Sequence, residues 1–311
     1  MAFRYDLLCV GLQVIDLLVT GADASIFERE TTNVGNIQLL LGGDALNQAV
    51  TASMLGARTA LMGSVGNDHL GEVLLSQLGN YPISVFDRKI DAKTGISVVL
   101  CRPDGERHFV LQTGHNEHFC YGHVDEEAVK SSAIVSIGSC MSLKGFDGED
   151  TVRLFDLAHS AGGRTALDFK INRSEYDMPA ILESIRRADY VLPSEADVAK
   201  LTGEAGDPAK MAQGMRDLGA KNIVLKLGGR GCYLSAEGIE KHIPACPANC
   251  IDTTGAGDSF VAAFLHGVAQ GWDVESCARF ANAAGSIAVE HPGANGMIRS
   301  EAQVLARMRG E

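Results

Sequence analysis

Short apolar runs alternate with amphipathic stretches along most of the chain. The apolar runs are rich in Val, Ile and Leu and have the length of single buried strands. Between most of them, apolar residues recur at the three- and four-residue spacing of a helix that buries one face. This order indicates an α/β fold in which helices cover both faces of a mostly parallel sheet. The predicted helices span residues 44–55, 150–161, 178–187 and 208–218, and the predicted strands lie in "YDLLCVGLQVI", "ARTALMGSV", "SAIVSIGSC", "GRTALDFK", "ADYVLPS" and "KNIVLKLGG".

Two segments break this alternation, residues 31–41 and 93–114. The second has the pattern of a hairpin, because the turn residues Pro103, Asp104 and Gly105 join two alternating runs. Together the two segments are predicted to form a small separate sheet that lies as a lid over a site. No long linker or internal repeat divides the chain. We therefore expect one domain over residues 1–311, with the lid inserted in it.

The charge balance narrows the class of partner. The chain carries 27 Lys and Arg residues against 39 Asp and Glu residues, a net charge of −12, which argues against nucleic acid or an acidic membrane surface. No apolar run reaches the roughly 20 residues of a membrane-spanning helix. The first residues include acids and lack the basic start of a signal peptide. A small-molecule partner and a cytoplasmic location are therefore expected.

A glycine-rich turn stands directly before an apolar helix in "DTTGAGDSFVAAFL". The N–H groups of Gly255, Ala256 and Gly257 would lie at the positive end of that helix, which favours an anion such as phosphate. Asp258 follows in the first helical turn. This carboxylate could cap the helix, or it could accept the proton of a hydroxyl group that attacks phosphorus. The spacing alone leaves both roles open, and capping is the commoner of the two.

Other polar residues are expected near the same site. "LLGGDALNQAV" is a second Gly-Gly that leads into a helix, and Asn47 lies one turn inside it. Asp16 follows the first predicted strand, and "LKLGGRG" ends another strand in glycines. Ligands of open α/β sheets bind at the carboxyl ends of the strands. We therefore expect Asp16, Asn47 and Asp258 to face one cleft.

Four of these motifs, taken together, carry a family resemblance. "GGDALNQAVTASMLGARTALMGSVGND", a central "TG" with "GERHF", "LGGRG" and "DTTGAGDSF" occur in the order typical of the ribokinase-like (PfkB) family of carbohydrate and nucleoside kinases. The resemblance extends from Tyr5 to Gly296. It implies a three-layer α/β/α sandwich with a central mostly parallel sheet and a small β-sheet lid. It also implies transfer of the γ-phosphoryl group of ATP to a hydroxyl group.

The resemblance assigns roles to individual positions. Asp258 corresponds to the general base, while the N–H groups of Gly255, Ala256 and Gly257 would hold the phosphoryl oxygens. Carboxylate and amide groups suit sugar hydroxyls because they accept and donate hydrogen bonds. The positions that correspond to sugar contacts are Asp16, Gly42, Gly43 and Asn47, and those that correspond to nucleotide contacts are Lys226, Gly228, Gly231 and Asn282. Many relatives carry Thr in place of Lys226, which could instead be an exposed loop residue.

Two ion sites are also implied by the resemblance. Relatives commonly have Asn-x-x-Glu after the "ADYVLP" strand, a pair that organises Mg²⁺ through water, whereas this chain has Ser194 and Asp197. Both can still bind water in the hydration shell of Mg²⁺. Family members often hold a monovalent cation beside the anion site, and Asp252 and Thr254 match that position. The expected cofactors are thus ATP and Mg²⁺, with K⁺ as a further candidate.

The nature of the acceptor stays open between several alternatives. In "LDFKINRSEYD", Lys170 and Arg173 could meet the carboxylate of a sugar acid, or they could be ordinary surface cations. Aromatic residues make up only 6% of the chain, which favours a sugar over a nucleoside that needs flat stacking partners. A nucleoside kinase and a non-catalytic sugar-binding regulatory protein are the alternatives. Exposed strands in the predicted lid also favour a homodimer formed through the two lids.

Overall fold

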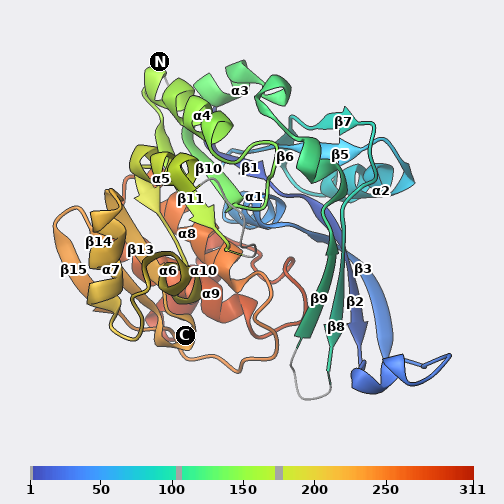
Figure 1. Ribbon diagram of the computed structural model, residues 1–311. Coiled ribbons are helices and arrows are strands. Elements are labelled where there is room, and N and C mark those ends of the chain that lie inside the picture. Colours follow the sequence, from blue (N-terminus) through green and yellow to red (C-terminus); the bar gives the residue numbers. More distant parts are fainter. Residues whose placement is uncertain (1–2, 103–106, 172–177) are drawn as a thin grey trace.

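The computed structural model describes residues 3–102, 107–171 and 178–311, and in these residues a nine-stranded sheet forms the centre of the molecule (Figure 1). Every neighbouring pair from β6 to β13 is parallel, and β14 and β15 continue the sheet as an antiparallel hairpin. The strands, in their order across the sheet, are β15 (Ile239–Ile243), β14 (Cys232–Ala236), β13 (Asn222–Lys226), β12 (Tyr190–Val191), β11 (Arg164–Phe169), β10 (Ser132–Cys140), β1 (Tyr5–Gly11), β4 (Thr59–Met62) and β6 (Ile83–Val85).

Helices cover both faces of this sheet. Strand β1 shows why, because Leu7 and Cys9 are buried in one hydrophobic cluster whereas Leu8 and Val10 are buried in another. A strand buried on both faces has no polar side, so its sequence is a continuous apolar run. The first cluster includes residues of α1 (Asp44–Met54), α2 (His69–Leu78), α8 (Ala256–Ala269), α9 (Val274–Ala288) and α10 (Glu301–Arg309). The second includes residues of α3 (Glu126–Lys130), α4 (Glu149–Ser160), α5 (Met178–Arg187), α6 (Glu195–Thr202) and α7 (Pro208–Asp217). These layers confirm the predicted α/β/α sandwich.

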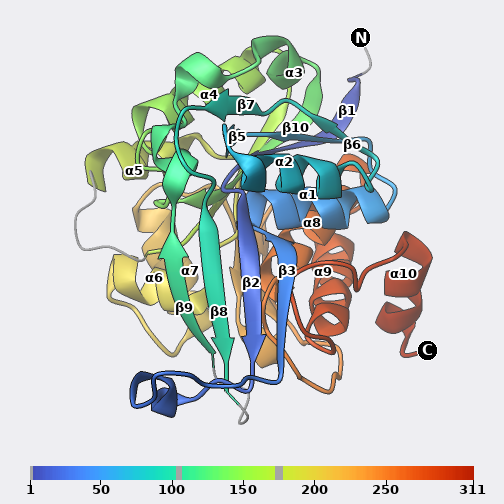
Figure 2. The same cartoon turned by 90° about the vertical axis from the view of Figure 1, so that its right-hand side faces the viewer.

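A separate four-stranded sheet stands beside this body and forms the lid (Figure 2). Its strand order is β3 (Asn36–Gly42), β2 (Val14–Thr20), β8 (Ile96–Cys101) and β9 (Arg107–Gln112). Strands β8 and β9 pair antiparallel, as the predicted hairpin requires. The predicted turn at Pro103, Asp104 and Gly105 lies outside the described residues. The short strands β5 (Ser64–Gly66) and β7 (Arg88–Ile90) pair near the base of the lid.

One predicted strand was wrong. "YDLLCVGLQVI" was assigned to a single strand of the central sheet, but β1 ends at Gly11 and β2 begins at Val14 in the lid. Gly11 has φ 140°, and a Cβ there would overlap the carbonyl oxygen of Gly138. Only glycine permits this backbone turn. Asp16 therefore lies in the middle of a lid strand, not after the end of β1.

The predicted helices agree with α1, α4, α5 and α7 to within one residue at each end. Several helices begin at side chains that accept a hydrogen bond from the first turn, such as Asp68 before α2 and Asp207 before α7. In the described parts of the chain, no helix combines the length and the apolar character needed to cross a bilayer.

Candidate active site

The glycine-rich turn forms the start of α8. Gly255 is the N-cap residue with φ 72°, and a Cβ there would lie 2.6 Å from the Cα of Ala294. A side chain would therefore strain the backbone and collide with the segment after α9. The N-cap residue offers no side chain to the first turn, so the N–H groups at this end have no side-chain cap. The turn thus has the properties of an anion site at a helix N-terminus.

Asp258 lies in this first turn and is 8% exposed. Its Oδ2 accepts a hydrogen bond of 2.8 Å from Nδ2 of Asn47, which comes from α1. Burial raises the pKa of Asp258 well above its usual value, the nearby charge of Asp44 raises it further, and the hydrogen bond from Asn47 opposes both effects. The carboxylate is thus a stronger base than an exposed aspartate, and it accepts its hydrogen bond from another helix.

An ion pair lies beside the same turn. Lys226, at the end of β13, places its Nζ 2.9 Å from both oxygens of Asp168, at the end of β11. A Cβ added to Gly257 would lie 3.6 Å from that Nζ, so the ammonium group is next to the turn. Burial raises the pKa of Asp168 to about 6, and the charge of Lys226 opposes this increase. Lys226 is therefore a largely buried cation rather than an exposed loop residue.

Asp16 faces the site from the lid. A Cβ at Gly42 would overlap its carboxylate, which explains why glycine stands there. Gly43 follows with φ 97° and leads the chain into α1. Burial raises the pKa of Asp16 to about 6, although a hydrogen bond from Ser97 opposes the increase. The carboxylate therefore changes its charge in the range just below neutral pH.

The residues predicted to contact the nucleotide lie around the loops after β13 and β15. Gly228 has φ 58°, and a Cβ there would meet no atom within 4 Å, so its backbone is open. Gly231 packs against the carbonyl of Ile243 and has no room for a side chain. Nδ2 of Asn282 donates to the carbonyl oxygens of Ile243 and Pro244, at 3.1 Å each. Asn282 thus holds the loop after β15 in place.

The comparisons with known proteins agree with this geometry. The family model "pfkB family carbohydrate kinase" matches residues 5–301. The chain belongs to the pfkB family of carbohydrate kinases. Ribokinase from Bacillus subtilis is 29% identical, and the match covers 95% of this chain and 96% of that protein. Fructokinase-1 from Oryza sativa subsp. japonica is 28% identical over 99% of each. The solved structure of Arabidopsis thaliana ribokinase complexed with ribose and ATP has a TM-score of 0.81, 26% identity and 99% coverage of both chains.

Membership in the pfkB family makes the protein a phosphotransferase with an alcohol group as acceptor, and the family's kinases use ATP. Asp44, the first residue of α1, is a residue of this carbohydrate kinase's site that was not predicted from the sequence. Its charge raises the pKa values of Asp16, Asp168 and Asp258, so it stands among all three carboxylates. The only sequence signal for Asp44 was its position directly after two glycines, as an acid at the start of a predicted helix.

Arg107 is a second residue that sequence reasoning missed. It lies on β9 of the lid, and its guanidinium contacts Asp252, Thr253 and Thr254, directly before the glycine-rich turn of α8. The ion pair with Asp252 is largely buried. A monovalent cation at Asp252 and Thr254 would have to displace this guanidinium. The residues as arranged therefore do not fit the cation that the resemblance implied.

Ser194 and Asp197 form the N-terminal cap of α6. Oγ of Ser194 accepts from the N–H of Asp197 and also contacts its carboxylate, while Oδ1 of Asp197 accepts from the N–H of Ile171 at 2.9 Å. Each carboxylate oxygen can accept more than one hydrogen bond. The carboxylate of Asp197 therefore keeps acceptor capacity for a water molecule in the hydration shell of Mg²⁺.

Of the two cations predicted to meet a sugar acid, the structure places one. Lys170 is exposed after β11, and its Nζ lies 5.8 Å from the ring centroid of Phe109 on the lid. This distance is typical of a cation–π contact between the body and the lid. Arg173 lies outside the described residues.

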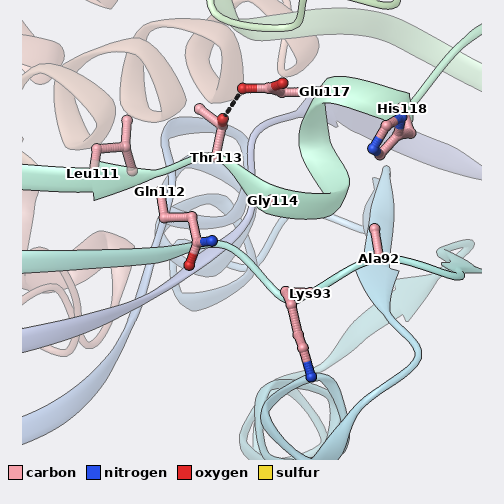
Figure 3. Close-up of a pocket in the computed structure, with 8 residues that line it drawn as sticks. All are labelled: Ala92, Lys93, Leu111, Gln112, Thr113, Gly114, Glu117 and His118. Atoms are coloured by element: carbon pink, nitrogen blue, oxygen red, sulfur yellow. Dashed lines mark hydrogen bonds between the residues drawn. The ribbon is translucent and has the colours of Figure 1, made fainter.

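A cavity of about 540 Å³ lies at the base of the lid, where β9 meets the short helix η2 (Gly114–His118) (Figure 3). Thr113 and Glu117 contact each other on one side of the ribbon, and the side chains of Gln112 and Lys93 lie on the other. None of the residues that line it was predicted to contact sugar or nucleotide. We assign this cavity no part in the phosphoryl transfer site.

Proposed function

We propose that this carbohydrate kinase transfers the γ-phosphoryl group of ATP to a hydroxyl group of a monosaccharide or a sugar acid, with Asp258 as the general base. The observation that carries the proposal is the buried Asp258 carboxylate in the first turn of α8, directly after Gly255 to Gly257 and hydrogen-bonded by Asn47. A base and an anion site on consecutive residues supply the two requirements of phosphoryl transfer to an alcohol.

Each residue has a definite task in this reaction. Asp258 takes the proton of the acceptor hydroxyl. At the same time the hydroxyl oxygen bonds to the γ-phosphorus, and the bond from that phosphorus to the leaving ADP oxygen breaks. The N–H groups of the turn and the ammonium group of Lys226 stabilise the charge on the transferring group. Asp16 accepts hydrogen bonds from acceptor hydroxyls and orients them. On the side of the site proposed for ATP, Gly228 and Gly231 provide backbone without side chains.

Magnesium is expected at the phosphates of ATP, held through water by Asp197 with Ser194. When bound, Mg²⁺ neutralises phosphate charge and so lowers the barrier to transfer. The acceptor capacity left on the carboxylate of Asp197 supports this assignment. The cap contacts of the same residues keep that carboxylate in a fixed position.

The lid supports two further parts of the proposal. We propose that Lys170, which lies beside Phe109, meets the carboxylate of a sugar acid as the lid closes. On the opposite face of the lid, Ile37 and Val110 are 62% and 53% exposed, and Leu39 is partly exposed as well. An exposed apolar sheet face of this kind favours a second copy of the chain as its cover, so a homodimer through the lids is proposed. A cytoplasmic location also stays a prediction.

An acceptor screen tests the proposed function. Purified protein, ATP and Mg²⁺ are assayed for ADP release with ribose, fructose, other ketoses, hexonates and adenosine as separate acceptors. We expect release with at least one sugar or sugar acid, none above background with adenosine, and loss of the activity in Asp258→Asn. Activity with adenosine alone would assign a nucleoside kinase. Sugar binding by calorimetry without turnover of any acceptor would assign a binding protein.

A further inference from the structure

Asn295 forms a chain of side-chain hydrogen bonds with the proposed base. Its Nδ2 donates to Oδ1 of Asn47 at 2.8 Å, and Nδ2 of Asn47 donates to Oδ2 of Asp258 at 2.8 Å. Asn295 belongs to the segment between α9 and α10, 248 residues from Asn47 in sequence. No motif in the sequence pointed to it. Through Asn47, this contact connects the segment after α9 to the turn that carries Asp258.

The orientation of both amides follows from a single backbone carbonyl. Nδ2 of Asn295 also donates to the carbonyl oxygen of Leu41, at 2.9 Å. A carbonyl oxygen can only accept, so the NH₂ group of Asn295 must face Leu41 and Asn47. The atom of Asn47 that meets this NH₂ group must then be Oδ1. Its own NH₂ group is left to donate to Asp258.

The opposite orientation would be costly. If the amide of Asn47 turned over, Oδ1 would face the carboxylate of Asp258 and Nδ2 would face the NH₂ group of Asn295. Two acceptors would then face each other at Asp258 and two donors at Asn295. Both contacts lie in a buried place, where an unmade hydrogen bond costs most. Asn47 is only 4% exposed, so water offers little compensation.

We propose that Asn295 is a positioning residue, which holds the amide of Asn47 so that its N–H points at the general base. This inference rests on the proposed function only for the catalytic role of Asp258. The hydrogen-bond chain itself does not depend on that role. Its expected effect is to keep Asp258 ionised at a lower pH than burial alone would allow.

The surroundings of Asp258 set the background for a pH test. Asp44 on α1 and Asp168 on β11 raise the pKa of Asp258, whereas Lys226 on β13 and the Asn47 hydrogen bond lower it. The thiol of Cys9 on β1 is also near and stays protonated, because burial raises its pKa. None of these groups is changed by a substitution at Asn295.

Two substitutions separate the effect of this hydrogen-bond chain from other effects. Asn295→Asp keeps the shape but replaces the NH₂ donor by an acceptor, so the amide of Asn47 is expected to turn its NH₂ group away from Asp258. The acidic limb of the kcat–pH profile should then move up by about one pH unit, with about a tenfold loss of kcat below that limb. Asn295→Ala removes the donor without adding charge and should shift the limb less, in the same direction. Because Asn47 itself corresponds to a sugar contact, the acceptor KM is measured separately, and the shift of the acidic limb is the deciding result.

A control and a second measurement keep the inference testable. Met297→Ala loosens the packing of the same segment but leaves Asn295 in place, so its pH profile should match the wild type. The ¹³C shift of the Asp258 carboxyl in ligand-free protein, assigned with Asp258→Asn, reports its pKa without any turnover. If the wild type phosphorylates no acceptor, the proposed function fails, yet this titration still decides the role of Asn295. An unchanged carboxyl pKa and an unchanged pH limb in both Asn295 variants would overturn the inference.

Discussion

The two sides of the active site are built differently. On the α8 side, Asn47, Asp258, Lys226 and Asn295 are tied together or to neighbours by hydrogen bonds and an ion pair between separate elements. On the lid side, Asp16, Arg107 and Phe109 stand on a four-stranded sheet, and Phe109 is 48% exposed. The α8 side is held by contacts between separate elements of the fold, which suits groups that must be aligned for chemistry. The lid side stands on a sheet separate from the central one, which suits groups that select and enclose the acceptor.

The difference predicts which kinetic constant each side controls. Substitutions on the α8 side should lower kcat, because these groups remove the acceptor proton, stabilise the transferring phosphoryl group or hold the groups that do so. Substitutions on the lid side should mainly raise the KM of the acceptor, because these groups orient the sugar and close over it. The two classes of variant can therefore be compared directly.

Apart from substitution of Asp258 itself, the largest effect in this comparison is expected for Lys226→Met. It removes the cation beside Gly257 and should lower kcat by about a hundredfold or more. The single variant also leaves Asp168 buried without its partner, a cost of about 3–5 kcal/mol in the free energy of unfolding. The double variant Lys226→Met with Asp168→Asn removes that burden. It should regain thermal stability but not kcat, and recovery of kcat to within a few-fold of wild type would show that Lys226 acts only through folding.

Asp16→Asn tests the lid side. We expect the acceptor KM to rise about tenfold or more, with a smaller change in kcat, since a carboxylate is replaced by a weaker acceptor. The pKa of Asp16 is raised to about 6 by burial, so in the wild type the carboxyl gains a proton as pH falls through that value. The wild-type KM should therefore rise below about pH 6, and this step should be absent in the variant. Identical KM–pH curves for the two proteins would refute the assignment.

Arg107→Ala tests the link between the two sides. Loss of the guanidinium frees the lid from Asp252, Thr253 and Thr254, so the acceptor KM should rise about threefold to tenfold. ATP hydrolysis without acceptor should increase relative to transfer. Arg107→Lys should recover only part of the effect, because an ammonium group cannot contact all three partners as a guanidinium does.

Potassium sharpens the same test. Replacing sodium by potassium at constant ionic strength should leave the wild type nearly unchanged, because Arg107 already occupies the oxygens of Asp252 and Thr254. A strong potassium requirement in the wild type would mean that the guanidinium leaves these oxygens during turnover.

The smallest effect on catalysis is expected on the outer face of the lid. Ile37→Lys combined with Val110→Lys places charge on the exposed apolar surface. Size-exclusion chromatography with light scattering should then give the mass of a 33.0 kDa monomer, whereas the wild type should give a dimer. The kcat should change by less than about threefold, since both side chains point away from the site. A monomeric wild type at micromolar concentration would disprove the dimer.

The sequence carried the layers of the fold because strand and helix periods are local. The glycine-rich turn could also be predicted from the sequence, since Gly255 to Asp258 are consecutive. The division of "YDLLCVGLQVI" between two sheets could not be predicted, because both halves are apolar. Only the close packing of Gly11 against Gly138 separates them. The partners of Asp258, Asp168 and Asp252 come from distant segments, and spacing along a chain does not specify such pairs.

The most direct measurement is single-turnover phosphoryl transfer by Asp258→Asn, with the affinities for ATP and acceptor measured on the same protein by calorimetry. If Asp258 removes the proton of the acceptor hydroxyl, both affinities should stay within about threefold of wild type while the transfer rate falls by about a thousandfold. Transfer within tenfold of the wild-type rate, with both ligands bound, would contradict the assignment of Asp258 as the base.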